Sequence, residues 1–504
     1  MWIYLIVIAI LLCLLDRVLN YNEKARLMKK MPGPRDHFIF GNAPVIMVSP
    51  VEIMKLGRTF AKTWKDGIYR LWMCPMAAVN IFNPADIETI TSNMKHNDKS
   101  SLYSLLKPWL GEGLLLSDGT KWHERRKILT PTFHFNILRK FFEVMEENSN
   151  HLVNSLNKVA GQTIDIVPYM SELTLQTICE TAMGTRLDEE TTSGSKIYKQ
   201  AIIDLVQVLY QRGTKIHYYS DLFFYLSPLG RKQGKLLKII HRFTERVIQD
   251  RIEYIDKYGI NLREDVDDHD LFMPKRKKIA MLDLLITAWK EGLLDRKGIQ
   301  EEVDTFMFEG HDTTASGLTF CLMLIANHKN VQDKVLEELN EIFGNSNRAI
   351  KVEDLTKMKY LECCIKEALR LYPPVHFISR NLNEPVTLSN YEIPAGVFCH
   401  IHIYDLHRRE DLFPNPNEFI PERFLPENSL GRHPYAFIPF SAGSRNCIGQ
   451  KFAIMEMKCV ISAVLREFEL IPVTRPCDIE YVADLILRNN GPVQLKCVKR
   501  SEIK

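Results

Sequence analysis

A single cysteine on a glycine-rich turn is the residue of this sequence with the clearest chemical potential. Residues 440–449 read FSAGSRNCIG, and no second cysteine or histidine lies close enough in sequence to Cys447 to share a metal ion with it. A thiolate is a strong, soft ligand for a transition metal. A lone thiolate suits haem iron, because the porphyrin supplies four ligands and the protein adds one. Cys447 is therefore a candidate axial ligand of haem iron.

The residues around this cysteine favour the same interpretation. Gly443 and Gly449 permit a tight turn whose backbone N–H groups point at the sulfur. A helix that we expect to begin near Ile448 would direct its positive end toward the thiolate, and Arg445 is placed to meet a haem propionate. An inert buried thiol is the stronger reading of Cys447 taken alone, and the full pattern Phe-x-x-Gly-x-Arg-x-Cys-x-Gly reverses that preference.

A second group of reactive side chains lies in residues 302–314, EVDTFMFEGHDTT. Their apolar spacing predicts a helix with Asp295 as its N-cap. Gly310 and the threonines are poor helix formers, and threonine hydroxyls can bond back to carbonyls, so we expect the helix to open locally beside a cofactor. Asp312 and Thr313 form an acid and alcohol pair that suits proton delivery into a dry pocket. A solvated pair on a long helix is the stronger reading when the pair is taken alone.

The run FSAGSRNCIG resembles the haem-binding loop of the cytochromes P-450, and further motifs of that family follow in the expected order. The string at 302–314 is similar to the signature of family 4, and the sequence as a whole looks closest to arthropod members. The resemblance covers nearly the whole chain. It implies a mainly α fold with small β-sheets (α+β), in which a long central helix crosses the haem, and it implies haem b as the cofactor.

The resemblance also implies roles for residues of these two motifs. Asp312 and Thr313 would relay protons during the activation of O2, and Gly310 and Phe440 are further candidate cofactor-binding residues. Glu309 lies four residues before Thr313, on nearly the same helix face, where a carboxylate is costly to bury unless it is paired or reacted. In many family 4 members the matching glutamate esterifies a haem methyl group. A covalent haem bond at Glu309 and a free carboxylate both remain open.

Two further motifs resemble parts of the family that hold the haem or its loop. In WHERRK, residues 122–127, the family places a tryptophan and an arginine against haem propionates, and a third propionate ligand follows a short β-like run; these are Trp122, Arg126 and Arg380. In KEALRLYPP and PERF the resemblance implies a buried structural network behind the haem loop, formed by Glu367, Arg370 and Arg423. Guanidinium groups suit carboxylates through paired hydrogen bonds.

The elements that must position these residues can be read from the apolar pattern. Residues 40–100 alternate short β-like runs with helical ones, and residues 118–345 are mostly helical. Prolines and glycines break residues 375–425 into short strands and loops, residues 449–467 return to helical spacing, and the last thirty residues look like hairpins. No linker or repeat divides the body, so we expect one domain, residues 36–504.

The amino terminus is expected to be a membrane anchor, residues 1–20. Residues 2–15 read WIYLIVIAILLCLL, and an apolar span of about 18 residues is reachable if Arg17 snorkels. A cleaved signal peptide is disfavoured, because no basic residue precedes the run and no small-residue cleavage site follows it. A basic segment and a Pro-Gly-Pro elbow follow at 21–35. The positive-inside rule then places the catalytic domain on the cytosolic side, and the resemblance implies the endoplasmic reticulum membrane and microsomes.

Composition excludes several other classes. The 504 residues carry 65 basic and 62 acidic side chains, a balance that argues against a nucleic-acid binder. The basic run 275–278 beside the acidic stretch 264–270 is interpreted as a surface loop. Eleven irregularly spaced cysteines indicate neither a disulfide framework nor a zinc site, and they are typical of a reducing compartment.

The function implied by the resemblance is monooxygenation of lipophilic substrates. No dinucleotide or flavin motif appears, so the electrons must come from another protein. The family implies NADPH–cytochrome P-450 reductase, with cytochrome b5 as a second candidate donor. Family 4 implies hydroxylation of fatty acids or related chains, often at the terminal methyl, with hormone, hydrocarbon or insecticide metabolism as alternatives. The alternatives are a haem-thiolate isomerase or dehydratase and a non-enzymatic haem sensor. The isomerases and dehydratases lack the acid and alcohol pair, and a sensor has no need of one.

The sequence also suggests residues for a substrate pocket and for a docking surface. The candidate substrate contacts are residues 109–115, 222–228, 375–378 and 485–487, of which 222–228 is either an entry lip or core. A basic docking face for an acidic electron donor would be built from Arg125, Lys127, Arg139, Lys140 and Lys451, each of which has an ordinary solvated helix face as its alternative.

Overall fold

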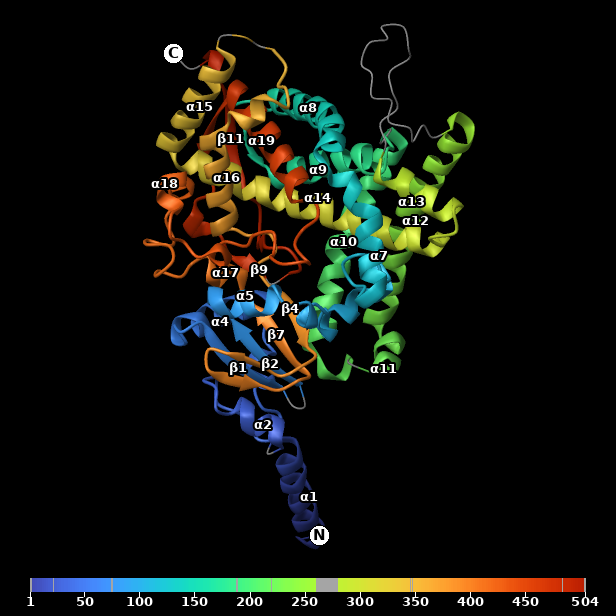
Figure 1. Ribbon diagram of the computed structural model, residues 1–504, viewed down its shortest axis with the longest axis vertical. Helices are drawn as coiled ribbons and strands as arrows, with labels where there is room; N and C mark the ends of the chain where they lie inside the picture. Colours follow the sequence, from blue (N-terminus) through green and yellow to red (C-terminus); the bar gives the residue numbers. More distant parts are fainter. Residues whose placement is uncertain are drawn as a thin grey trace.

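Helices make up most of the molecule, and a smaller β-rich part lies at the end from which the first helix projects (Figure 1). This computed structural model describes residues 2–502 apart from residues 21, 74–75, 187–188, 219, 260–279, 345, 347 and 483. The expected loop at 264–278 lies outside the described residues. The division into long helices and small sheets is the one that the sequence pattern predicts.

The long amphipathic stretches between residues 118 and 345 form helices, because apolar side chains recur at helical spacing and bury one face of each. Before the central helix they are α7 (Gly119–Leu129), α8 (Phe135–Asn157), α9 (Val167–Thr181), α10 (Glu189–Thr214), α11 (Asp221–Leu226), α12 (Pro228–Tyr258) and α13 (Met281–Lys290). Helix α15 (Lys329–Phe343) follows it. Beyond residue 345 the helices are α16 (Lys359–Leu371), α17 (Ile403–Leu406), α18 (Pro426–Ser429) and α19 (Gln450–Glu467).

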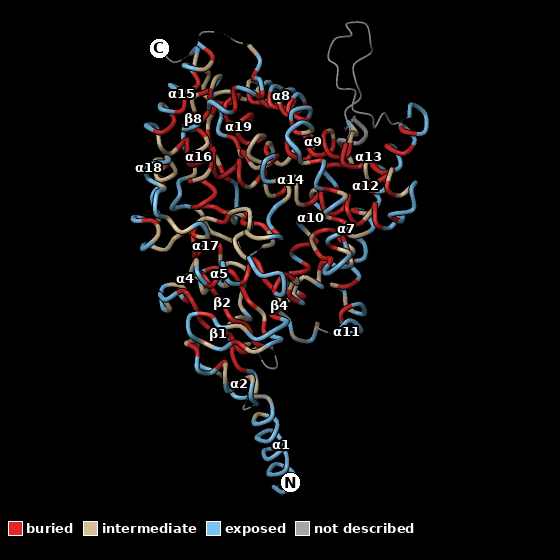
Figure 2. Tube along the Cα trace, in the orientation of Figure 1, coloured by how far each residue is buried: buried red, intermediate tan, exposed pale blue. Residues whose placement is uncertain are grey.

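The central helix α14 (Arg296–Asn327) crosses the middle of the helical part (Figure 1). Its N-cap is Asp295, as predicted, and that carboxylate accepts a hydrogen bond from the Gly298 N–H at 2.7 Å. The Thr313 hydroxyl donates to the Glu309 carbonyl oxygen at 2.7 Å, which is the back-bonding that the sequence suggested. The helix nevertheless runs without interruption, so the expected local opening is wrong: most of its side chains are buried among neighbouring helices (Figure 2), and this packing holds it.

Short strands from both ends of the sequence share one four-stranded sheet. Its order is β1–β2–β7–β4, and its strands are β1 (Ile68–Met73), β2 (Met76–Ile81), β7 (Val397–Ile401) and β4 (Ile378–Leu382). Strands β2 and β7 pair in parallel with Ala78 opposite Phe398, whereas the other two pairings are antiparallel. This sheet carries a second cluster of buried apolar side chains, separate from the helical core.

The remaining strands and the amino-terminal helices are short. The three-stranded sheet β3–β11–β8 and two hairpins use β3 (Thr163–Asp165), β11 (Gln494–Lys499), β8 (Phe468–Pro472), β5 (Val386–Leu388), β6 (Tyr391–Ile393), β9 (Tyr481–Val482) and β10 (Arg488–Asn489). The helices near the start are α2 (Glu23–Met28), α3 (Ala43–Ile46), α4 (Pro50–Thr63), α5 (Pro84–Thr91) and α6 (Lys107–Leu110). Of the hairpins expected in the last thirty residues, the described part of the chain contains β9–β10, whereas β11 pairs with β8 and β3.

Helix α1 (Trp2–Asn20) stands apart from the body and exposes its apolar side chains (Figures 1 and 2). Ile3, for example, is 76% exposed. Within the part of the chain that the structure describes, no helix combines the length and the apolar character needed to cross a membrane.

Candidate active site

Hydrogen bonds within the predicted motif hold the loop before α19 in a tight turn at Cys447. The Cys447 N–H donates to the Phe440 carbonyl oxygen at 2.9 Å, and the Asn446 N–H donates to that of Gly443 at 3.1 Å. Gly443 has a φ of 73°, and a Cβ at this position would lie 1.8 Å from the Thr91 carbonyl oxygen, so only glycine fits. Helix α19 begins at Gln450, two residues later than expected.

The Cys447 sulfur is accessible and yet surrounded by protein groups that act on its charge. Cys447 retains exposed surface. Desolvation nevertheless raises the pKa of its thiol to about 11, the Glu309 carboxylate raises it further, and a hydrogen bond from the Gly449 N–H together with Arg126 opposes them. Binding to a metal ion would deprotonate this thiol.

Two buried arginines near the loop have donors that no group of the described residues satisfies. Nη2 of Arg445 donates at 2.6 Å to both the Ser117 carbonyl oxygen and the Asp118 carboxylate, and its guanidinium lies 4.6 Å from the centre of the Trp122 ring. Among the described residues, Nε and Nη1 of Arg445 and Nε of Arg380 have no hydrogen-bond partner. Burial lowers the pKa of Arg445 to about 10. Buried donors without partners are rare, so these groups suit a bound anion.

Lys99 adds a third positive charge that the sequence analysis missed. It forms an isolated β-bridge with Arg380, and its Nζ lies 4.7 Å from the centre of the Tyr103 ring. Burial lowers the pKa of Lys99 well below its ordinary value, and the charges of Arg380 and Arg445 act in the same direction, against Glu309. Its segment, NDKSSLY, has no recognisable motif, so only the fold could reveal this cation.

These groups fit a haem. An accessible thiol provides one ligand for iron, and two buried arginines with unsatisfied donors, beside the half-buried Lys99, suit the two propionate carboxylates. Cys447, Lys99, Arg380 and Arg445 would therefore hold the group.

The two residues of the WHERRK motif lie against the same loop. Arg126 donates from Nη1 to the Asn446 carbonyl oxygen and from Nη2 to the Asn446 side-chain oxygen, both at 2.8 Å. Trp122 is buried and packs on the Arg445 guanidinium. Arg126 thus braces the residue that precedes Cys447, a contact that the expected propionate role did not include.

The central helix brings Glu309 to the thiol side of the site and packs Gly310 against α9. Desolvation raises the pKa of Glu309 to about 7, while the charges of Lys99 and Arg126 lower it. A Cβ on Gly310 would lie 2.7 Å from the side chain of Ile178 on α9. The glycine therefore permits the close packing of α9 on α14, and its place beside the cofactor stays a prediction.

Asp312 lies in an ion pair that sequence analysis did not predict. Its carboxylate accepts a hydrogen bond from Nη2 of Arg488 at 2.5 Å, and Nε of Arg488 donates to Asp484 at 3.0 Å. All three side chains are mostly buried. Arg488 lies in LILRNN near the carboxyl terminus, 176 residues from its partner, and no local signal connects the two.

The predicted network of Glu367, Arg370 and Arg423 is present and fully bonded at its centre. Arg370 donates twice to Glu367 at 2.7 Å and three times to backbone carbonyl oxygens. Nε of Arg423 donates to Glu367 at 3.2 Å. One of the carbonyls belongs to His407, whose Nε2 accepts the Ile438 N–H at 2.9 Å, and so this histidine connects the network to the approach of the Cys447 loop.

The candidate electropositive face is smaller than predicted. Arg125 is buried, with its guanidinium 3.9 Å from the carboxylate of Glu301 and 3.8 Å from that of Glu302, so it is not a surface cation. Arg139 is paired with Glu353 at 2.7 Å. The candidates that are exposed and have no ion pair within the described chain are Lys127, Lys140 and Lys451.

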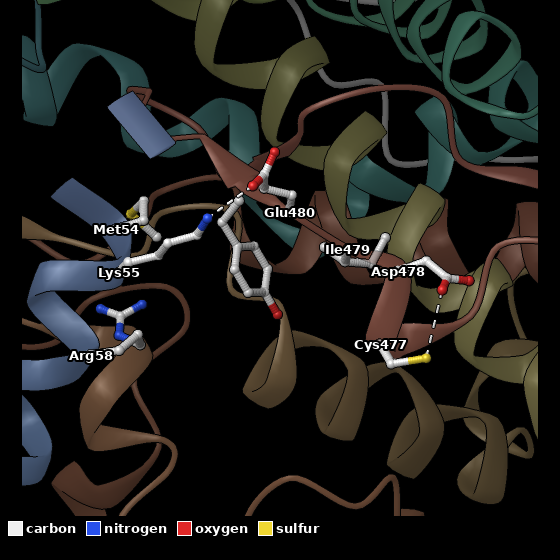
Figure 3. A pocket seen from close by; sticks show the side chains of 8 residues that line it. Met54, Lys55, Arg58, Cys477, Asp478, Ile479 and Glu480 are labelled. Atoms are coloured by element: carbon white, nitrogen blue, oxygen red, sulfur yellow. Dashed lines mark hydrogen bonds and ion pairs between the residues drawn. The ribbon is translucent and has the colours of Figure 1, made fainter. Parts of the chain in front are cut away.

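A surface pocket of about 280 Å³ between α4 and residues 477–481 is separate from this site (Figure 3). None of the predicted site residues lines it. Lys55 and Glu480 form an ion pair across it at 3.0 Å, and its remaining charges, Arg58 and Asp478, are also of opposite sign. The pocket therefore has no net charge that would select a ligand.

Comparison with known proteins gives consistent matches along nearly the whole chain. The family model described as Cytochrome P450 matches residues 31–497. Cytochrome P450 4c3 of Drosophila melanogaster is 41% identical over 95% of this chain and 92% of its own length. Cytochrome P450 4V2 of Homo sapiens is 39% identical over 98% and 94%, and Cytochrome P450 4g15 of Drosophila melanogaster is 35% identical over 94% and 93%.

Proposed function

The chain belongs to the cytochrome P450 family and is a haem-thiolate monooxygenase, and from this premise we propose that it hydroxylates fatty acids or related lipophilic chains. The observation that carries the catalytic assignment is an accessible Cys447 thiol beside buried arginines with unsatisfied donors. The substrate class is supported by the likeness of residues 302–314 to the family 4 signature.

When bound, haem supplies the iron at which O2 is reduced and one oxygen atom is transferred to the substrate. The protein's part is to orient that group and to manage protons. Cys447 would ligate the iron, Gly449 would donate a hydrogen bond to the sulfur, and the cluster of Lys99, Arg380 and Arg445 would bind the propionates. Hydrogen bonds to a ligating sulfur tune the metal centre.

Asp312 and Thr313 are the proposed proton relay. They are adjacent on α14, and Thr313 is already oriented by its bond to the Glu309 carbonyl oxygen. Asp312 would pass protons toward the hydroxyl of Thr313 while the apolar surroundings exclude bulk water. Glu309 faces the thiol side of the site, which is compatible with the proposed ester to a haem methyl group.

Substrate would approach from apolar surfaces near α6 and α11. Trp109 is buried and packs on Phe308 of α14 with ring centres 4.5 Å apart. Helix α11 exposes Leu222, Phe223 and Leu226, each by more than 60%, which favours the entry-lip reading of this segment over the core reading.

Membrane attachment is proposed through α1, whose exposed apolar side chains would be buried by lipid. Helix α11 lies toward the same end of the molecule as α2 (Figure 1), so both surfaces could meet one membrane. The site of residence would be the endoplasmic reticulum membrane, with the catalytic part on the cytosolic side. Electrons would come from NADPH–cytochrome P-450 reductase, with cytochrome b5 as a second donor, through Lys127, Lys140 and Lys451.

The test uses the full-length holoprotein reconstituted with reductase and NADPH. Reduction under carbon monoxide should give the Soret band typical of haem-thiolate proteins. Mass spectrometry should then detect addition of one oxygen atom to fatty acids of graded length, concentrated near the chain end. A normal carbon monoxide spectrum with no reductase-dependent oxidation of any lipophilic chain would contradict the proposed substrate class.

A further inference from the structure

The ion pair of Asp312 is an unusual setting for a proton donor. Its carboxylate is 7% exposed and accepts the 2.5 Å bond from Arg488, so its orientation is fixed by a residue outside α14. A buried carboxylate gains stability from a guanidinium only when the geometry is good and the remaining donors are used. The placement of Arg488 therefore decides where the Asp312 carboxylate points.

Asp484 holds the other side of the same guanidinium. Its carboxylate accepts from Nε of Arg488 at 3.0 Å, and the side chain of Asp484 is 12% exposed. Burial lowers the pKa of Arg488, but the two carboxylates outweigh burial and raise it. One guanidinium thus bridges two carboxylates and cannot move toward solvent without leaving both of them.

The segment that carries Arg488 is tied to α14 at a second point. One helical turn beyond Asp312, the Ser316 hydroxyl donates to the Leu487 carbonyl oxygen at 2.9 Å, and the Leu487 N–H donates to the Pro374 carbonyl oxygen at 2.8 Å. Residues 485–487 are the candidate substrate contacts of this segment. A substrate that displaces residues 484–489 would therefore move Arg488 as well.

We propose that Arg488 is a positioning residue that orients Asp312 for proton delivery and links residues 484–489 to that relay. The inference rests on the proposed role of Asp312 and Thr313. When the relay is well placed, two electrons and two protons convert O2 into one inserted oxygen atom and one water. When it is misplaced, the same two electrons and two protons leave as hydrogen peroxide, so the ratio of peroxide to product reports the position of the acid.

The variants are Arg488→Lys and Arg488→Gln, with Asp312→Asn as the reference for loss of the relay. Lysine keeps the charge and loses the two-sided geometry of the guanidinium. The matched control is Arg475→Lys, because Arg475 pairs with Asp478 in the same carboxyl-terminal region and lies outside the site. Each holoprotein must first show an unchanged carbon monoxide spectrum, which separates misplacement from misfolding.

We expect Arg488→Lys to raise the ratio of peroxide to product roughly tenfold, because a small misplacement of a catalytic group costs on the order of 10- to 100-fold. The solvent isotope effect on product formation should rise with it, while the control stays at the wild-type ratio. A second readout is independent of turnover: amide hydrogen exchange of residues 484–489 in the holoprotein should speed up in Arg488→Gln and in Asp312→Asn, because both break the tie to α14.

The outcomes separate the two claims. If Asp312→Asn keeps the wild-type ratio of peroxide to product, the proposed relay is wrong and the inference falls with it. If Asp312→Asn shifts the ratio and both Arg488 variants keep it, the relay stands and the positioning role is overturned. If the Arg488 variants shift the ratio but the exchange of residues 484–489 is unchanged, the link to that segment is overturned.

Discussion

Two buried arginines, Arg370 and Arg445, occupy opposite situations within one molecule. Arg370 is completely buried and uses five hydrogen bonds, two to Glu367 and three to backbone carbonyl oxygens. Arg445 is also buried, but its Nε and Nη1 meet no acceptor among the described residues. The same side chain is thus satisfied by the fold in one place and left incomplete in the other.

The difference distinguishes an arginine that stabilises the fold from one whose remaining donors suit a bound ligand. An unsatisfied buried donor destabilises a fold by about 1–3 kcal/mol, so a protein keeps one only where something else completes it. Near Arg445 the proposed partner is a haem propionate, and Arg380 likewise has an Nε without an acceptor among the described residues. Around Arg370 the chain supplies every acceptor, which suits a part that only holds the loop.

The largest effect is expected from removing the thiol. Cys447→Ser should abolish the haem-thiolate spectrum and the monooxygenase activity, because a hydroxyl is a far poorer ligand for iron at neutral pH. The Arg370 cluster should be unaffected, so the secondary structure measured by circular dichroism should match wild type. An active pigment with an unchanged spectrum would contradict the assignment of the ligand.

Breaking the satisfied cluster should cost stability. Glu367→Gln removes the charge that pairs with Arg370 and Arg423, and we expect the free energy of unfolding to fall by about 3–5 kcal/mol. Chemical denaturation of the holoprotein measures this loss. The matched control is Glu353→Gln, whose partner Arg139 is exposed, and it should change stability by less than about 1 kcal/mol. Equal losses for the two variants would mean that burial does not distinguish them.

Among the described residues, Glu456 is a buried carboxyl without an arginine partner, and its protonation should make the stability of the protein depend on pH. Glu456 on α19 is 1% exposed, and burial raises the pKa of its carboxyl to about 8 against the opposing effect of the Thr177 hydroxyl. The folded state therefore binds a proton more tightly than the unfolded state, whose carboxyl titrates near 4.5. The stability contribution is complete below the unfolded pKa and is lost as the pH rises toward about 8.

Glu456→Gln should remove this dependence, because the amide is neutral at every pH. We expect the variant to be more stable than wild type by about 5 kcal/mol at alkaline pH, and the two to converge near pH 4. Thermal unfolding at a series of pH values measures the difference. Parallel curves for variant and wild type over the whole range would show that Glu456 does not titrate on unfolding.

The smallest effect is expected at the incomplete arginine. In a Glu309→Ala background, which cannot form the proposed ester, Arg445→Gln should speed the loss of haem to apomyoglobin by roughly tenfold, because one charged partner of a propionate is removed. Unfolding of the haem-free protein should change little by comparison with Glu367→Gln, since two of the arginine's donors were unsatisfied there. A haem-free protein destabilised as strongly as by Glu367→Gln would place Arg445 in the structural class.

The sequence predicted the parts of this site whose residues lie close together along the chain. The Cys447 turn, the N-cap Asp295 and the Glu367–Arg370 pair are local patterns, and each is present. The positions of Lys99 and Arg488 depend on contacts between distant segments, which local pattern does not encode. The prediction that Arg125 lies on the surface was wrong. Its burial depends on Glu301 and Glu302 of α14, which are distant in sequence, so the spacing within its own helix does not reveal it.

The parallel pairing of β2 with β7 has a consequence for how the chain is made. Strand β2, which contains Ala78, can pair with β7 only after Phe398, about 320 residues later, has been synthesised. During synthesis on the ribosome the early half of the sheet therefore remains uncovered while the helical part emerges, which favours chaperone binding and slow completion. Cys447, the proposed iron ligand, follows later still, so haem could be captured only after nearly nine-tenths of the polypeptide has been translated.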